Sequence, residues 1–218
     1  MLRANEPFQF ATASYLICIG NQEARNLLEL EEGIAGCSDA SIFYHTFQSL
    51  GRHHFLTEGF SNDFAQWVLS SCNRPVLAER LASVDIRDYV TLAELRSDLR
   101  RIVGEYCRAS RQEASQQAFE TFSFCETIEE KLPLGREAWT LPEFHDGLKD
   151  LAHASLQFHF ITSRLRLQLR SNDFSQWLSK ELGCVEIARR IEQIDIYTNT
   201  LDAARAAILQ LVDGGIAR

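Results

Sequence analysis

The feature that most constrains this chain is a motif that occurs twice. Ser-Asn-Asp-Phe-Ala-Gln-Trp at residues 61–67 recurs at residues 171–177 with a single change. Because other motifs recur in the same order around it, we expect two copies of one folding unit. We place the copies at residues 8–107 and 122–213, joined by a polar linker at residues 108–121, within a single compact domain spanning residues 1–218.

Each copy carries the signals of short amphipathic helices. Asn26 and Thr140 each stand three residues before a glutamate, which is the capping-box spacing that begins a helix. Apolar residues then recur every three or four positions, and the chain has only four prolines. These patterns predict an all-α fold of about ten helices, as two homologous five-helix repeats packed about a pseudo-twofold axis.

Two smaller features also occur in both copies. Phe-x-Phe stands at residues 8–10 and 122–124, and we expect short extended segments that pack their rings against helices without forming a sheet. Gly33 and Gly147 fall inside the first expected helix of each copy. Because a glycine within a helix costs about 1 kcal/mol relative to alanine, its repetition predicts the close approach of another helix.

Composition narrows the function classes. The chain is 45% hydrophobic and 24% charged, and its net charge of -8 argues against a nucleic-acid-binding surface. We find no apolar run of the length that a signal peptide or a membrane span needs, so we expect a cytoplasmic protein without a membrane partner. The six cysteines show no zinc-ligand spacing and are expected to be small apolar residues in a reducing compartment.

A serine and a histidine one turn apart recur in both copies, as Ser41 with His45 and Ser155 with His159. The serine hydroxyl could hold one imidazole nitrogen, and an aspartate from another helix could hold the other. One interpretation is a buried histidine whose hydrogen bonds are all satisfied. The other is a general base in the first copy, where His45, Asp63 and Asp85 are the catalytic candidates.

The remaining retained positions also have two interpretations each. Asn62 and Asp63 precede an apolar helical pattern, so they are expected to cap a helix, with ligand binding as the alternative. Asp85, like Asp195 in the second copy, is expected to cap the next element, with metal ligation as the alternative. Trp67 is expected in the core, with stacking against a sugar or base as the alternative.

The copies differ after the second expected helix, where the first copy has four extra residues and contains His53 and His54. Together with His45 and Asp63 these histidines could bind zinc, iron or manganese. The H-E-x-x-H motif of metal-binding helices is absent from the sequence, however. We therefore predict no cofactor and keep a transition metal as the alternative. A ligand site, if present, is expected to use the residues Ser41, His45, His53, His54, Asn62, Asp63 and Trp67.

Several stretches together resemble a bacterial family catalogued as a domain of unknown function. They are Thr-Ala-Ser-Tyr-Leu at residues 12–16, Ser-Asp-Ala-Ser-Ile-Phe-Tyr-His-Thr at 38–46 and Ser-Asn-Asp-Phe-Ala-Gln-Trp-Val at 61–68. The resemblance spans nearly the whole chain and carries no established activity or catalytic residue. It implies a connection with genes for sugar transfer and trehalose-type metabolism.

We therefore expect a binding, regulatory or accessory protein, whose partner is a small polar ligand or another protein. A homodimer is left open. The rival hypothesis is an enzyme with a histidine and aspartate site in the first copy, with or without a metal ion.

Overall fold

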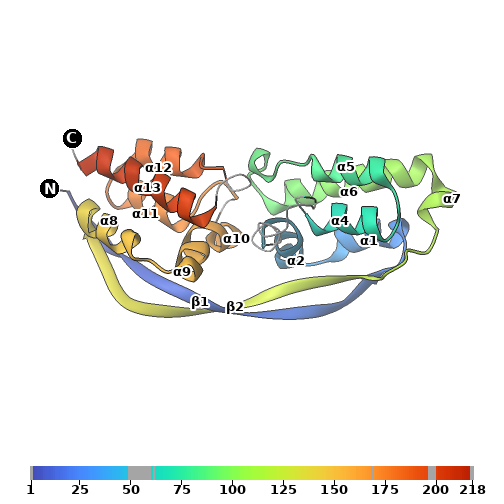
Figure 1. Ribbon diagram of the computed structural model, residues 1–218, viewed down its shortest axis with the longest axis horizontal. Helices are drawn as coiled ribbons and strands as arrows, with labels where there is room; N and C mark the ends of the chain where they lie inside the picture. Colours follow the sequence, from blue (N-terminus) through green and yellow to red (C-terminus); the bar gives the residue numbers. More distant parts are fainter. Residues whose placement is uncertain (1, 49–59, 61, 168, 196–199, 217–218) are drawn as a thin grey trace. The chain divides into compact units, whose positions relative to one another are not determined.

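The structure is a computed structural model, and it describes residues 2–48, 60, 62–167, 169–195 and 200–216. It is 58% helical and 21% strand, with an antiparallel two-stranded sheet. The prediction of an all-α fold is therefore wrong. The two Phe-x-Phe segments are parts of long strands, β1 (Arg3–Ala24) and β2 (Phe122–Thr140), which lie side by side (Figure 1).

Sequence analysis did not predict these strands because most of their length does not pack against a hydrophobic core. The side chains from Glu130 to Glu137 in β2 are all exposed, so no alternation of apolar and polar residues marks the strand. Pro133 and Gly135, which has a φ of +67°, would normally argue against a strand. Both are tolerated because a strand in a two-stranded sheet has only one neighbour to bond.

The chain forms two compact units, and each contains the helices of one sequence repeat. The first-repeat unit comprises Leu16–Ile128, and the second-repeat unit comprises Met1–Tyr15 together with Glu129–Arg218. Each strand therefore begins in one unit and ends in the other. The single compact domain stays a prediction.

The helices of the first-repeat unit follow the expected order. In sequence they are α1 (Leu27–Gly36), α2 (Asp39–Phe43), the π-helix η1 (Tyr44–Gln48), α4 (Asp63–Ser70), α5 (Pro75–Ala82), the 3-10 turn η2 (Ile86–Asp88), α6 (Leu92–Ala109) and α7 (Arg111–Ala114). The linker that we expected at 108–121 contains the end of α6 and the short helix α7.

The second-repeat unit has the same order of helices. They are α8 (Leu141–Lys149), α9 (His153–Gln157), the π-helix η3 (Phe158–Thr162), α10 (Ser163–Arg166), α11 (Asp173–Lys180), α12 (Val185–Glu192) and α13 (Leu201–Ile216). The segment that distinguishes the copies, with His53 and His54, lies outside the described residues.

The expected helix caps are confirmed. The Asn26 side chain accepts a hydrogen bond from the Glu29 amide at 2.9 Å at the start of α1. Thr140 forms a complete capping box with Glu143 at the start of α8. Local sequence thus accounts for where these helices begin.

Each Phe-x-Phe segment packs against the helices of the other repeat. In the first-repeat unit, Phe122 from β2 lies 5.3 Å from Phe64 between ring centroids. In the second-repeat unit, Phe8 from β1 lies 5.5 Å from Phe174. Because Phe8 and Phe122 begin the first and the second repeat respectively, each repeat completes its core with a strand that belongs to the other by sequence.

The repeated glycines make room for these rings. A Cβ atom at Gly33 would lie 2.2 Å from Cζ of Phe124, and a Cβ atom at Gly147 would lie 2.2 Å from Cζ of Phe10. The prediction that another helix approaches here is wrong, because the approaching group is a phenylalanine ring from a strand. A glycine was still required, since any larger residue would collide with that ring.

We expect Gly33→Ala and Gly147→Ala each to lower the free energy of unfolding by about 1 to 3 kcal/mol, because the added methyl group overpacks the core. Urea denaturation measures this loss. Gly36→Ala is the matched control on α1, since its Cβ atom would meet nothing closer than 3.4 Å and the substitution favours a helix. Equal stability of the Gly33 and Gly36 variants would contradict the packing described here.

Candidate functional site

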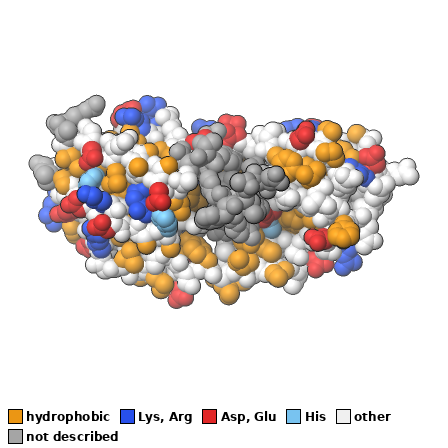
Figure 2. Space-filling model, in the orientation of Figure 1, with side chains coloured by type: hydrophobic (Ala, Val, Ile, Leu, Met, Phe, Trp, Pro, Cys, Tyr) orange, Lys and Arg blue, Asp and Glu red, His pale blue; other side chains and the backbone are white. Residues whose placement is uncertain are grey.

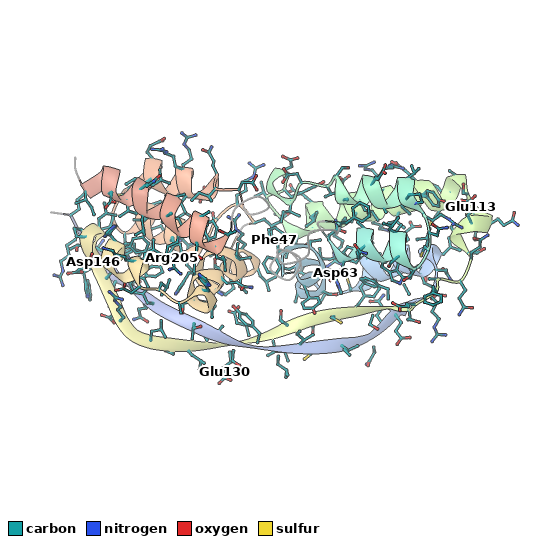
Figure 3. All side chains as sticks on the ribbon, viewed as in Figure 1. Phe47, Asp63, Glu113, Glu130, Asp146 and Arg205 are labelled. Atoms are coloured by element: carbon teal, nitrogen blue, oxygen red, sulfur yellow. The ribbon has the colours of Figure 1, made fainter. Side chains whose placement is uncertain are left out.

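His45 lies where the helices of the first-repeat unit meet β2. The π-helix η1 carries the ring, and Asp63 at the start of α4 approaches Nδ1 with its Oδ2 atom at 2.9 Å (Figure 3 labels Asp63). The backbone N–H of Cys125 in β2 donates to Nε2, also at 2.9 Å. The histidine thus joins two helical elements to the strand through both of its nitrogens.

His159 makes the same contacts in the second-repeat unit. It lies on the π-helix η3, and its Nδ1 is 2.8 Å from Oδ2 of Asp173. The backbone N–H of Ala11 in β1 donates to its Nε2 at 2.9 Å. Ala11 and Cys125 occupy matching positions after the two Phe-x-Phe segments. Both histidine side chains are almost fully buried, with exposures of 4% for His45 and 2% for His159.

A tryptophan on the next helix bonds the chain close to the same Phe-x-Phe segment. The indole N–H of Trp67 donates to the backbone carbonyl of Glu120 at 2.8 Å, and that of Trp177 donates to the carbonyl of Glu6 at 2.9 Å. Both rings are buried. Each Phe-x-Phe segment is therefore followed by an N–H that donates to a histidine and preceded, two residues earlier, by a carbonyl that accepts from a tryptophan, with a phenylalanine ring packed between them.

The hydrogen bonds define which nitrogen of each neutral ring carries the proton. Because a backbone N–H donates to Nε2, that nitrogen accepts and the proton of a neutral ring sits on Nδ1, facing the aspartate. Burial lowers the pKa of His159 below its ordinary value, since the imidazolium loses hydration, although Asp173 opposes this shift. A second proton would also place an N–H against the N–H of Ala11.

The histidine-bound aspartate of the second-repeat unit has charged neighbours. Arg166 on α10 donates to Oδ2 of Asp173 at 3.0 Å and to Glu129 of β2 at 2.9 Å. Burial raises the pKa of the Glu129 carboxyl, against the pull of Arg166. Asp173 therefore receives bonds from an imidazole and a guanidinium, which fix its position.

The retained polar residues mostly hold structure together. Asn62 caps α4 by accepting from the Ala65 amide at 2.9 Å, and its amide group donates to the Leu81 carbonyl at 3.0 Å. Asp63, the first residue of α4, binds His45. The expectation that an aspartate of another helix holds the imidazole matches the geometry. The Ser41 hydroxyl does not take the other nitrogen, and among the described residues it is buried without a hydrogen-bond partner.

The other candidates do not gather around His45 in the described part of the chain. Asp85 directly precedes the 3-10 turn η2, and Asp195 follows α12, both half-buried. His53 and His54 lie outside the described residues, so their part in a ligand or metal site stays a prediction. Within the described residues, no three His, Cys, Asp or Glu side chains are placed to hold a metal ion.

Sequence reasoning missed the backbone groups that complete the site. These are the N–H groups of Ala11 and Cys125 and the carbonyl groups of Glu6 and Glu120. Backbone atoms have no side-chain signature, so only the constant spacing between the two Phe-x-Phe segments and the two histidines could have indicated them.

Fold and site together define a protein in which two duplicated helical units share a strand pair, each strand fastened by a histidine, an aspartate and a tryptophan. The chain belongs to a family of unknown function (DUF5752), whose model matches residues 5–213. It is also similar to the solved structure of OrfY from Thermoproteus tenax, at 29% sequence identity and a TM-score of 0.85, over 99% of this chain and 98% of that one. No curated protein matches the chain.

We expect His45→Leu and His159→Leu to destabilise the protein by about 1 to 3 kcal/mol each, because each leaves a buried strand N–H without its acceptor. Chemical denaturation measures both values. The exposed His153 provides the control, since His153→Leu should change the free energy of unfolding by less than about 0.5 kcal/mol. Loss of function without loss of stability at His45 alone would instead support the catalytic interpretation.

Stability should also fall as the pH drops below about 6.5, the ordinary pKa of histidine. Because the pKa of His159 is lowered in the folded chain, in this pH range the unfolded chain binds a proton that the folded chain does not bind. The free energy of unfolding, measured by urea titration from about pH 7 to pH 5, should therefore decline less steeply in His159→Gln. An identical decline in the variant would contradict a His159 ring that stays neutral in the folded protein.

Proposed function

We propose that the protein acts by binding another protein, as a cytoplasmic regulatory or accessory component. The observation that carries this proposal is the exposure of Ile17 and Ile19, which are 52% and 72% exposed on β1. Being two residues apart on a strand, they project from the same face. Exposed aliphatic side chains that stand together on a regular element are typical of protein-docking surfaces.

Further aliphatic side chains of the first-repeat unit are exposed on the same pair of strands. Leu16 on β1 is 64% exposed and, being next to Ile17, projects from the opposite face, and Ile128 on the paired strand β2 is 57% exposed. Figure 2 shows apolar side chains exposed along the lower edge of the view, where Figure 1 draws the two strands. Buried histidine and tryptophan side chains attach this strand pair to the helices near its ends. The exposed aliphatic residues therefore lie on an element whose position is fixed.

The hydrogen bonds made by His45 support a binding function over a catalytic one. A general base needs a free nitrogen within hydrogen-bond reach of a substrate proton. Both nitrogens of His45 already have partners, and the ring is buried. The same arrangement at His159 is accounted for by strand attachment alone, so no chemical role is needed to explain why the residues recur.

The family connection with sugar transfer and trehalose-type metabolism suggests which partner to test first: an enzyme of glycosyl transfer. None of the described helices has both the length and the apolar composition that a membrane span requires. A partner in the cytoplasm fits this proposal.

A photo-crosslinking residue placed at position 19 should capture a discrete partner protein in cells of the native host. Ile17→Ser in the same chain should weaken that product, because it removes a neighbouring part of the apolar surface. Gln112, an exposed residue on α7, is the control position and should not yield the product. The same product at both positions, or none at position 19, would reject docking through the strands.

A further inference from the structure

In the first-repeat unit, one edge of the strand pair meets the helices and the other does not. A strand has two edges, and one edge of β2 is paired with β1. The other edge of β2 carries the N–H of Cys125, which donates to His45 on η1. In this unit β1 is therefore the outer strand (Figure 1). Among the described residues, no hydrogen bond from outside the strand pair reaches the backbone of β1 at residues 16–22.

This outer edge lacks the features that keep an edge strand from pairing. An open strand edge offers a row of N–H and C=O groups to any other strand, and proteins block it with charged residues or proline. Residues 16–22 contain neither a charge nor a proline, and they end an uncharged run from Pro7 to Gln22, the longest in the sequence. Five of these seven residues are exposed, so another strand can reach them.

The second-repeat unit blocks the matching edge. In that unit β1 bonds the histidine, so β2 is the outer strand. The offset of 114 residues between the copies matches residues 16–22 of β1 with residues 130–136 of β2, which include Glu130, Lys131, Pro133 and Arg136. One outer edge is thus protected by charges and a proline, whereas the corresponding edge in the other repeat is open to pairing.

We propose that two copies of the chain pair through the outer edges of their β1 strands, antiparallel, and form a four-stranded sheet. The backbone groups of an edge are matched by those of another strand, which fixes the kind of occupant. A net charge of -8 makes two copies repel each other, and along this run identical strands meet without like charges. A two-fold contact of this kind uses both edges, so assembly stops at the dimer.

The pairing leaves the aliphatic side chains of β1 accessible. Its hydrogen bonds lie in the plane of the sheet, whereas side chains project above and below that plane. A two-fold axis perpendicular to the sheet therefore brings Ile17 and Ile19 of both copies onto one face. The dimer does not rest on the proposed docking function, but it doubles the aliphatic surface that this function would use.

The contact is small, which decides what kind of dimer to expect. A strand edge of this length buries less than the roughly 800 Å² per partner that is usual in stable complexes. We therefore expect a reversible dimer. Sedimentation equilibrium of the purified full-length chain should show a mass that rises with concentration from one copy to two.

The double variant Ile17→Lys with Ile19→Pro copies the residues that β2 carries at the matching positions, Lys131 and Pro133. It should raise the dissociation constant of the dimer about tenfold or more, because a charge and a proline block edge pairing. Pro133 shows that a proline fits at this place in the strand pair, and unchanged circular dichroism would confirm that the variant is folded. Ile128→Lys, at an exposed isoleucine of the inner strand, is the matched control and should leave the dimer intact.

Amide hydrogen exchange locates the contact. Because every second residue of a strand directs its N–H to one edge, alternate amides at residues 16–22 should exchange more slowly at high protein concentration than at low. A dimer whose amides there exchange as in the monomer, or one that the double variant leaves intact, would overturn the proposal. So would a chain that stays monomeric at every concentration. A monomer would leave the crosslinking of a host protein at position 19 unaffected, which separates this inference from the proposed function.

Discussion

The structure depends on a neutral imidazole that accepts a backbone N–H from a strand. In each unit, an aspartate fixes the histidine proton on Nδ1, and this leaves Nε2 as the acceptor for Cys125 or Ala11. A strand at this place would otherwise bury an unsatisfied N–H, at a cost of about 1 to 3 kcal/mol. The π-helical turns η1 and η3 carry the two histidines, and turns of this rare kind often accompany such specialised positions.

The exchange of strands explains which residues the two copies retain. An isolated two-stranded sheet is marginally stable in water, so its ends need a core to pack against. Phe8 and Phe10 enter one aromatic cluster and Phe122 and Phe124 enter the other, over glycines that leave space for a ring. The histidine, aspartate, tryptophan and glycine thus form one interdependent attachment, and this dependence accounts for their recurrence without a catalytic role.

The two copies differ at positions that take no part in this attachment. At the junction of α5 with α6, Arg80 and Arg101 bond the Glu105 carboxylate, whereas Gly214 stands at the matching position of α13. Surface substitutions of this kind change stability little, so the copies could diverge there while both kept the same framework.

The sequence by itself determined the duplication, the helices and their caps, because these depend on residues within a few positions of one another. Asn62 could be predicted as a cap for this reason. Only the tertiary structure decided that the Phe-x-Phe segments are strands and that each serves the other repeat. Ala11 and His159 lie 148 residues apart, and the group that Ala11 contributes is a backbone N–H that every residue except proline possesses. No local pattern specifies which of two similar cores a strand will enter, since that choice depends on the path of the whole chain.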